Sequence, residues 1–313
     1  MSTEFGGPLI GKAEPLIAVI DTGGTWTRAA LGAERIEAEN IWRTSTAHQL
    51  EEHTENVARL VELVTDNRRP DILAYGIAGN PSANGLTIVE AGALKKYGWL
   101  NQPIVEQASA ATGVPLDQII LMNDLVAPAL AEREQDRRKI TGSKNILTLL
   151  PDEYVGVVKA ISTGTNNAVY DKYGAENMES GHNVKIDKEA AGPCGCGQCN
   201  DAEAWISGTG ILNRFGISGK DMDPEDPRWH EYRADLGIVM DAEFVMMNGL
   251  LAARNRNQHI RTLKLFGSVA TGNSGAIPYL RERYPGLTIT ETTYGEDGGL
   301  YGGYFAGLEK LAA

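Results

Sequence analysis

The chain has 313 residues, 42% of them hydrophobic and 22% charged, which is the length of about two domains and the balance of a globular protein with an ample core. Its net charge of −12 argues against nucleic acid and anionic membranes as partners, because both bind a surplus of basic side chains. No apolar run approaches the roughly 20 residues of a membrane span. Residues 1–11 are expected to form a flexible tail without a signal sequence.

The first half alternates short apolar runs with helical patterns. The β-branched run 16–20 predicts a buried strand that ends in the glycine turn 21–25, DTGGT. Further patterns predict strands at 28–31, 36–43, 72–76 and 119–122, and helices at 50–64, 103–112 and 123–134.

The charged stretch 132–144 is expected to separate the two halves. Beyond it, the patterns predict strands at 146–150, 155–162, 168–170 and 262–266, helices at 241–255, 277–284 and 298–311, and a surface excursion at 219–235. The strand that ends in residues 162–165, STGT, repeats the first strand and its turn weakly. Strands alternating with helices predict an α/β protein with a mostly parallel or mixed sheet.

All three cysteines lie close together, at Cys194, Cys196 and Cys199, and His182 precedes them. Three thiolates and an imidazole form a closed tetrahedral set that suits structural zinc. The alternatives are three ordinary buried cysteines, or a redox pair that lacks the strand and helix such a motif requires. A cluster of this kind rules out a disulfide framework and indicates a reducing, cytoplasmic compartment.

Two glycine–threonine turns are candidates for binding phosphate, because glycines leave backbone N–H groups unobstructed. The first comprises Asp21, Gly23, Gly24 and Thr25, in which Asp21 could hold Mg²⁺ directly or through water, and the second comprises Thr163, Gly164 and Thr165. A third turn, at Gly267 and Ser268, suits the close approach of a flat base. The first turn alone could simply close a hairpin, and the presence of the second turn favours phosphate binding. The sequence contains neither a P-loop nor a dinucleotide-binding motif.

Polar residues suited to sugar hydroxyls follow these turns in the chain. Asn123 and Asp124 end a predicted strand, where α/β folds place reacting groups, although either could serve only as a helix N-cap. Glu179 and His182 precede the cysteines, and Glu203 follows them at the start of a predicted helix. The remaining histidines, at positions 48, 53, 230 and 259, lie in polar and predicted exposed surroundings, and no role is assigned to them.

Together these segments resemble the ROK family of sugar kinases, within the actin/hexokinase-like superfamily. The matching segments run in order from about residue 17 to residue 311: the turn 21–25, the glycine loop 76–79 with Gly85, Asn123-Asp124, the turn 162–165, the E-x-G-H motif at 179–182, the cysteine cluster with Glu203, and the turn 266–268. The family's zinc motif usually has its third cysteine where this chain has Asp201, so Cys199 is expected to reach the metal instead. Asn166 and Asn167 stand where the family commonly has glycines.

The resemblance implies a bilobal, duplicated, ribonuclease H-like fold with the active site in the interdomain cleft. The small domain would comprise residues 12–125 and 297–313, and the large domain, which carries the zinc motif, residues 126–296. In the family pattern Asp124 is the general base, and it would need no large pKa shift if the proton leaves late. The implied sugar contacts are Gly79, Asn80, Asn123, Asp124, Glu179, His182 and Glu203.

The implied activity is ATP-dependent phosphorylation of a hexose, with glucose at O6 as the first expectation and Mg²⁺ and structural Zn²⁺ as cofactors. An N-acetylhexosamine such as ManNAc or GlcNAc is the alternative substrate. A sugar-sensing ROK regulator is the alternative from another class, although the residues before the first strand leave no room for a helix-turn-helix domain. An actin-like assembly protein would have no use for the cysteine cluster. The resemblance also implies a homodimer or homotetramer in the cytoplasm.

Overall fold

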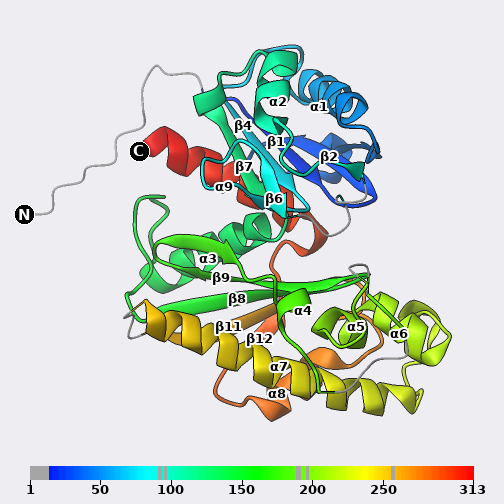
Figure 1. Cartoon of the computed structure of the whole chain (residues 1–313). Coiled ribbons are helices and arrows are strands. Elements are labelled where there is room, and N and C mark those ends of the chain that lie inside the picture. Colours follow the sequence, from blue (N-terminus) through cyan, green and yellow to red (C-terminus); the bar gives the residue numbers. More distant parts are fainter. Residues whose placement is uncertain (1–13, 91–93, 95–96, 188–191, 195–196, 255–257) are drawn as a thin grey trace, which may run out of the picture.

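The computed structural model describes residues 14–90, 94, 97–187, 192–194, 197–254 and 258–313. The predicted tail, residues 1–11, lies outside these ranges. Two five-stranded sheets organise the chain (Figure 1). We call the first sheet with α1, α2 and α9 the small lobe, and the second sheet with α4 to α8 the large lobe.

The small-lobe sheet has the order β3-β2-β1-β4-β7. β1 pairs antiparallel with β2 and parallel with β4, and β4 pairs parallel with β7. The strands are β1 (Ile17–Thr22), β2 (Trp26–Leu31), β3 (Trp42–Ser45), β4 (Ile72–Ile77) and β7 (Ile119–Asn123), and a separate hairpin joins β5 (Asn80–Pro81) to β6 (Ile88–Glu90). The predicted strand at 36–43 is instead a 3₁₀ turn, Ala38–Asn40, followed by β3.

The large-lobe sheet repeats this arrangement in the order β10-β9-β8-β11-β12. The antiparallel pairs β8–β9 and β9–β10 and the parallel pairs β8–β11 and β11–β12 correspond to those of the first sheet. The strands are β8 (Tyr154–Ile161), β9 (Thr165–Asp171), β10 (Gly174–Asn177), β11 (His259–Phe266) and β12 (Thr288–Glu291).

Helices cover both faces of each sheet. α1 (Leu50–Thr65) and α2 (Ile104–Thr112) bury one face of the small-lobe sheet, while α3 (Val126–Thr141) and α9 (Gly298–Ala312) bury the other. The outer face of the large-lobe sheet packs against α5 (Ala202–Ile206), α6 (Gly208–Phe215), α7 (Arg228–Ala253) and α8 (Ala276–Arg283). The short helix α4 (Ser180–Asn183) contacts β9 and α5. α3 lies between the lobes, with Leu125 and Ala129 against the second sheet (Figure 1).

α9 packs closely on α3 and β1 because several residues of its inner face are glycines. A Cβ at Gly302 would lie 1.6 Å from the carbonyl oxygen of Ala127, and one at Gly303 would lie 2.4 Å from Val19. Both distances are shorter than any real contact, so α9 needs glycine where it meets α3, at Gly302, and where it meets β1, at Gly303. The C-terminal segment is thereby fixed to the small lobe.

The charged stretch at 132–144 lies between the last strand of the small-lobe sheet and the first strand of the large-lobe sheet. It continues α3 to Thr141, and five of its charged residues are buried: Glu132, Arg133, Glu134, Asp136 and Arg137. Lys264 on β11 donates to Glu132 at 2.7 Å and to Asp136 at 2.6 Å. Glu132 also accepts from the backbone and hydroxyl of Thr293, in the segment that returns to the small lobe. The buried carboxylates of α3 therefore connect this helix to β11 and to the segment that returns to the small lobe.

Three smaller predictions also differ from the structure. Residues 146–150 form a turn and irregular chain rather than a strand. The segment 219–235 is only partly an excursion, because α7 begins at Arg228. His53 is buried rather than exposed: it bonds to the Tyr75 hydroxyl at 2.5 Å, and burial lowers its pKa to about 4.

α7 is 26 residues long and, by length and composition only, apolar enough to cross a membrane. Its polar contacts identify it as a core helix of the large lobe. Glu243 is fully buried and paired with Lys159 of β8 at 2.5 Å, and Asp235 is paired with Arg214 of α6 at 2.6 Å. Buried carboxylates with cationic partners on neighbouring elements fit a protein interior.

Candidate active site

Asp124 lies where β7 ends and the chain turns into α3. Its backbone N–H donates to the carbonyl of Ile77 at 2.8 Å, so the residue is held beside the end of β4. β1, β4 and β7 are parallel, and their carboxyl ends meet at one edge. Asp21, at the end of β1, therefore comes to the same edge as Asp124, where α/β sheets bind ligands.

The electrostatic surroundings of Asp124 favour a proton on its carboxyl group. Burial is the main cause, and the negative charges of Asp21 and Glu179 add to it, so the pKa rises from 3.8 to about 7. The proposed role of Asp124 did not require this shift, which arises because the tertiary structure buries the group and brings two further carboxylates close. A carboxyl group poised near neutral pH suits proton transfer.

The first glycine turn is braced by its own lobe. Gly23 donates its N–H to the carbonyl of Trp26 at 2.9 Å, which leaves the exposed Gly24 and Thr25 at the tip. Asp21 is paired with Arg28 at 2.5 Å. Arg28 also bonds to Asp297 at 3.0 Å, so this turn is tied to the segment that enters α9.

The second turn, residues 162–165, meets two other segments of the large lobe. Gly208, at the start of α6, donates to the carbonyl of Ser162 at 2.6 Å, and Thr209 bonds to the carbonyl of Thr163. Gly267 has a φ of +96°, and a Cβ there would lie 2.6 Å from the carbonyl of Ile161. The predicted phosphate turn and adenosine turn are therefore neighbours, with Thr163 and Ser268 exposed.

Thr165 differs from the other members of its turn. It is 4% exposed, and its hydroxyl donates to the carbonyl of Ala160 at 2.8 Å. Its backbone N–H points to the carboxylate of Glu203 at 3.3 Å. Thr165 thus holds the turn and Glu203 in place, while its neighbours form the accessible surface.

The acidic motif residues connect the two turns. Glu179 lies close enough to Asp124 to affect its pKa, and Nε2 of His182 lies 4.0 Å from Oε2 of Glu203. Burial and the charge of Glu90 raise the pKa of Glu179, whereas hydrogen bonds with Asn177 and Asn80 lower it. A row of polar groups thus leads from the first turn to the second: Asp21, Asp124, Glu179, His182, Glu203 and Gly164.

Glu179 has a left-handed backbone, with φ 48° and ψ 33°. This conformation is unfavourable for a side chain with a Cβ, and it occurs at functional sites when the surroundings over-determine it. Gly181 is equally restricted, because a Cβ would lie 2.0 Å from the carbonyl of Thr165. The motif is therefore folded tightly onto the second turn.

His182, Cys194 and Asp201 form a group whose ligand atoms lie within 4.8 Å of one another. Asp201, rather than Cys199, is thus the third member of this group among the described residues. Asp201 is the N-cap of α5: one carboxylate oxygen accepts from Ala204 N at 2.8 Å, and the other faces Cys194 Sγ at 3.1 Å. Cys199 comes before this helix start and is not part of the group among the described residues, while Cys196 lies outside them.

The small-lobe side of the site includes Asn123, Gly79 and Asn80. Asn123 is 4% exposed; it donates to the carbonyl of Gly79 at 3.2 Å and accepts from Leu125 N at 2.8 Å. These bonds hold the glycine loop against the start of α3. Asn80 extends from the same loop to Asn177 in the large lobe, with 2.9 Å between Asn177 Nδ2 and Asn80 Oδ1.

Four residues at the site were not assigned a role from the sequence: Arg28, Asn177, Asp201 and Thr209. Asp201 carried a signal, since it precedes Glu203 at the spacing of the family's third cysteine. Thr209 follows a Ser-Gly pair that starts a helix. Arg28 and Asn177 carried none, because one partner of each, Asp297 and Asn80 respectively, lies far away in the chain.

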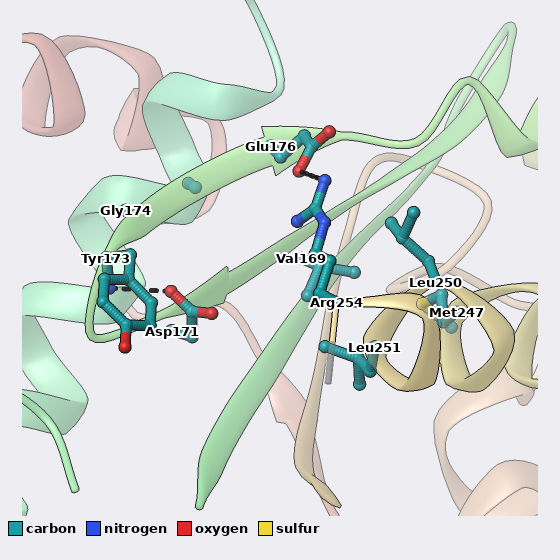
Figure 2. A pocket seen from close by; sticks show the side chains of 10 residues that line it. Val169, Asp171, Tyr173, Gly174, Glu176, Met247, Leu250, Leu251 and Arg254 are labelled. Atoms are coloured by element: carbon teal, nitrogen blue, oxygen red, sulfur yellow. Dashed lines mark hydrogen bonds and ion pairs between the residues drawn. The ribbon is translucent and has the colours of Figure 1, made fainter. Parts of the chain in front are cut away.

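A cavity of about 150 Å³ lies away from this site, between the β9–β10 hairpin and the end of α7 (Figure 2). Apolar side chains, among them Met247 and Leu251, form one wall, and the ion pair of Arg254 with Glu176 crosses it at 2.5 Å. None of the predicted site residues lines it.

A family model described as the ROK family matches residues 17–231. The chain belongs to the ROK family. The matched segment contains the first two turns, Asp124, the E-x-G-H motif and the metal-ligand group. No curated protein matches this ROK chain.

Solved structures share the whole bilobal, actin/hexokinase-like fold of this ROK protein. A ROK glucokinase from Streptomyces griseus, in complex with glucose and AMPPNP, has a TM-score of 0.65 at 15% identity and covers 94% of this chain and 99% of its own. A Listeria monocytogenes protein, whose name proposes an N-acetylmannosamine kinase, has a TM-score of 0.67 at 14% identity and covers 95% of this chain and 99% of its own. A ROK transcriptional regulator, a homologue of E. coli MLC, has a TM-score of 0.67 at 16% identity and covers 94% of this chain and 78% of its own.

Proposed function

We propose that this ROK protein is an ATP-dependent sugar kinase that phosphorylates a hexose, with O6 of glucose as the acceptor. The observation that carries the proposal is the row of polar groups from Asp21 through Asp124 to Glu203, which connects two glycine turns of different lobes. Phosphoryl transfer needs an acceptor hydroxyl and a phosphate donor aligned between groups of this kind.

In the proposed reaction Asp124 accepts the proton of the sugar hydroxyl. The hydroxyl oxygen bonds to the γ-phosphorus, the bond to the β-phosphate oxygen breaks, and ADP leaves with its electron pair. The raised pKa of Asp124, about 7, makes its carboxylate a stronger base than an ordinary aspartate. Glu179, His182, Glu203 and the amide of Asn123 orient the sugar hydroxyls, each of which can donate and accept a hydrogen bond.

The turns at Gly24, Thr25, Thr163 and Gly164 would bind the phosphates of ATP, and the turn at Gly267 and Ser268 would contact the adenosine. The glycines fit this use, since backbone approaches backbone closely at Gly208 and Gly267. Mg²⁺ supplies charge neutralisation when it is bound with the nucleotide. Asp21 is already paired with Arg28, so contact through water would leave this ion pair intact.

The donor set of His182, Cys194 and Asp201 fits a zinc ion, which accepts imidazole, thiolate and carboxylate ligands. Zinc supplies a structural crosslink there. Nδ1 of His182 faces Asp201 at 3.2 Å, while Nε2 faces Glu203. His182 would therefore be oriented through one nitrogen and present the other to the sugar.

A coupled assay of ADP formation with ATP and a panel of sugars tests the proposal. Glucose-dependent ADP release by the wild type supports it, and release only with ManNAc or GlcNAc would assign the alternative substrate. Sugar binding in calorimetry without any ADP release would instead support the alternative of a sugar-sensing regulator, to which the solved ROK regulator is the structural parallel. We also propose a cytoplasmic homodimer or homotetramer, and sedimentation analysis would measure the mass.

A further inference from the structure

Asn177 joins the two lobes at the proposed sugar site. It is the last residue of β10, and its Nδ2 donates to Oδ1 of Asn80 in β5 of the small lobe at 2.9 Å and to Oε1 of Glu179 at 2.5 Å. Its Oδ1 accepts from Nδ2 of Asn166 at 2.9 Å and from Glu179 N at 3.4 Å. A primary amide has two donor and two acceptor positions, so every one is used.

The small-lobe end of this contact is also fixed. Asn80 lies opposite Glu90 in the β5–β6 hairpin, and its Nδ2 donates to Oε2 of Glu90 at 3.2 Å. Since both side chains of the Asn80–Asn177 pair have further partners, neither can turn its amide without losing a bond. We call Glu90, Asn80, Asn177, Asn166 and Glu179 the cross-lobe network.

We propose that Asn177 is a positioning residue: it holds the lobes together across the sugar site and aims the carboxylate of Glu179 at the sugar. The second part of this inference rests on the proposed function. Glu179 needs such support, because its backbone is left-handed and its carboxylate would otherwise turn away from Glu90, whose charge raises its pKa. Asn177 bonds both to the backbone and to the carboxylate of Glu179, so one side chain fixes the residue at two points.

The proposal predicts a defect that is specific to the sugar. Asn177→Ala should raise the KM for the sugar about tenfold or more, since a hydrogen bond to a charged group is worth about 1.5–3 kcal/mol. The KM for ATP should stay within about twofold of wild type, because none of the network residues belongs to the nucleotide turns. Asn248→Ala, at an exposed position of α7, is the matched control and should behave as wild type. Equal kinetics of Asn177→Ala and Asn248→Ala would overturn the proposal.

A double-mutant cycle tests whether Asn177 acts through Asn80. If the pair acts as one unit, the double variant with both asparagines replaced by alanine should be no worse than the poorer single variant. Fully additive effects would contradict the cross-lobe role. Asn177→Asp provides a second variant of the same size, whose carboxylate oxygen would face the oxygens of Glu179 and Asn80. It should be at least as impaired as Asn177→Ala, and wild-type kinetics for Asn177→Asp would refute the donor role.

Small-angle X-ray scattering without any ligand separates this inference from the proposed function. Loss of the Asn80–Asn177 bond should give a larger radius of gyration for Asn177→Ala and Asn80→Ala than for wild type and Asn248→Ala. If no sugar supports ADP release by the wild type, the proposed function fails, while scattering still decides whether the network joins the lobes. Identical scattering from all variants would disprove the joining role even in an active kinase.

Discussion

The two sheets have equivalent strand orders, yet the residues at the ends of the corresponding strands β1 and β8 differ in chemical character. In the small lobe this position is Asp21, a carboxylate paired with Arg28. In the large lobe it is Ser162, whose carbonyl accepts from Gly208 N. A Cβ at the nearby Gly164 would lie 2.9 Å from the carboxylate of Glu203. Both lobes therefore supply carboxylates to the site, Asp21 from the small lobe and Glu203 from the large lobe, but the large-lobe turn is also packed closely against the start of α6.

The connections between the strands differ in the same way. The small lobe adds the β5–β6 hairpin and α2 after β4, whereas the large lobe adds α4 to α7 and the metal-ligand group between β10 and β11. Duplicated sheets thus provide equivalent edges, and unequal insertions provide the specific contacts. The following predictions test this division, from the largest expected effect to the smallest.

Asp124→Asn should cause the largest loss, because it removes the general base that we propose at the small-lobe edge. We expect kcat to fall about 10²- to 10⁴-fold, the usual contribution of proton transfer, with the affinity for sugar changed by less than about tenfold. Asp117→Asn, at an exposed position before β7, serves as the control. Near-normal kcat in steady-state assays of Asp124→Asn would remove this residue from the mechanism.

Lys264→Met should be the most destabilising of these changes. The face of the large-lobe sheet toward α3 is charged there, and the substitution would leave Glu132 and Asp136 buried without their shared cation. We expect a loss of about 3–5 kcal/mol in the free energy of unfolding, typical of breaking a buried ion pair, measured by urea titration. Lys172→Met, whose pair with Asp152 is at the surface, should change stability little. Equal stability of both variants would show that the buried charges do not hold α3 to the large lobe.

Cys194→Ser and Asp201→Ala should both lose bound zinc and weaken sugar binding about 10- to 100-fold, because His182 loses the metal that orients it. Cys199→Ser should keep its zinc, since its thiol is not part of the group in the described structure. Elemental analysis of the purified variants measures the metal directly. Zinc loss in Cys199→Ser together with full retention in Asp201→Ala would reverse the assignment.

The pH dependence should reveal the carboxylates that gather around Asp124. The base must be ionised, so kcat/KM should fall about tenfold per pH unit below the pKa, which is about 7 in the free protein. In Glu179→Gln this acid limb should move to lower pH, because the negative charge that raises the pKa of Asp124 is removed. Glu282→Gln, at an exposed site on α8, should leave the limb in place. An unchanged acid limb in Glu179→Gln would contradict the proximity of Glu179 to Asp124.

The two turns should respond unequally to the same small substitution. A Cβ at Gly23 would be 3.8 Å from its nearest neighbour, whereas one at Gly164 would press on the Glu203 carboxylate. We expect Gly164→Ala to raise the KM for the sugar about three- to tenfold, equivalent to about 1 kcal/mol, and Gly23→Ala to leave it unchanged. Equal effects of both substitutions on this KM would argue against the difference between the turns.

Local patterns were sufficient to predict most strands, the three turns and the grouping of His182 with Cys194. Helix α3 shows where they fail. Its charges follow no amphipathic pattern, because the helix is buried between two lobes and the charges are matched by Lys264 and Thr293, more than a hundred residues further along the chain. The prediction that His53 is exposed fails for the same reason, since its partner Tyr75 is on a strand that local sequence does not identify as a neighbour.

The amino-acid sequence by itself determined the alternation of strands and helices, the repeat of the glycine turns and the family. These features depend on periodicity and on residues a few positions apart. Only the tertiary structure decided that Asp201 joins His182 and Cys194, that Asp124 has a pKa of about 7, and that Asn177 bonds to Asn80. Each of these depends on the distance between groups on different elements and on their removal from water, and neither quantity is encoded in local sequence.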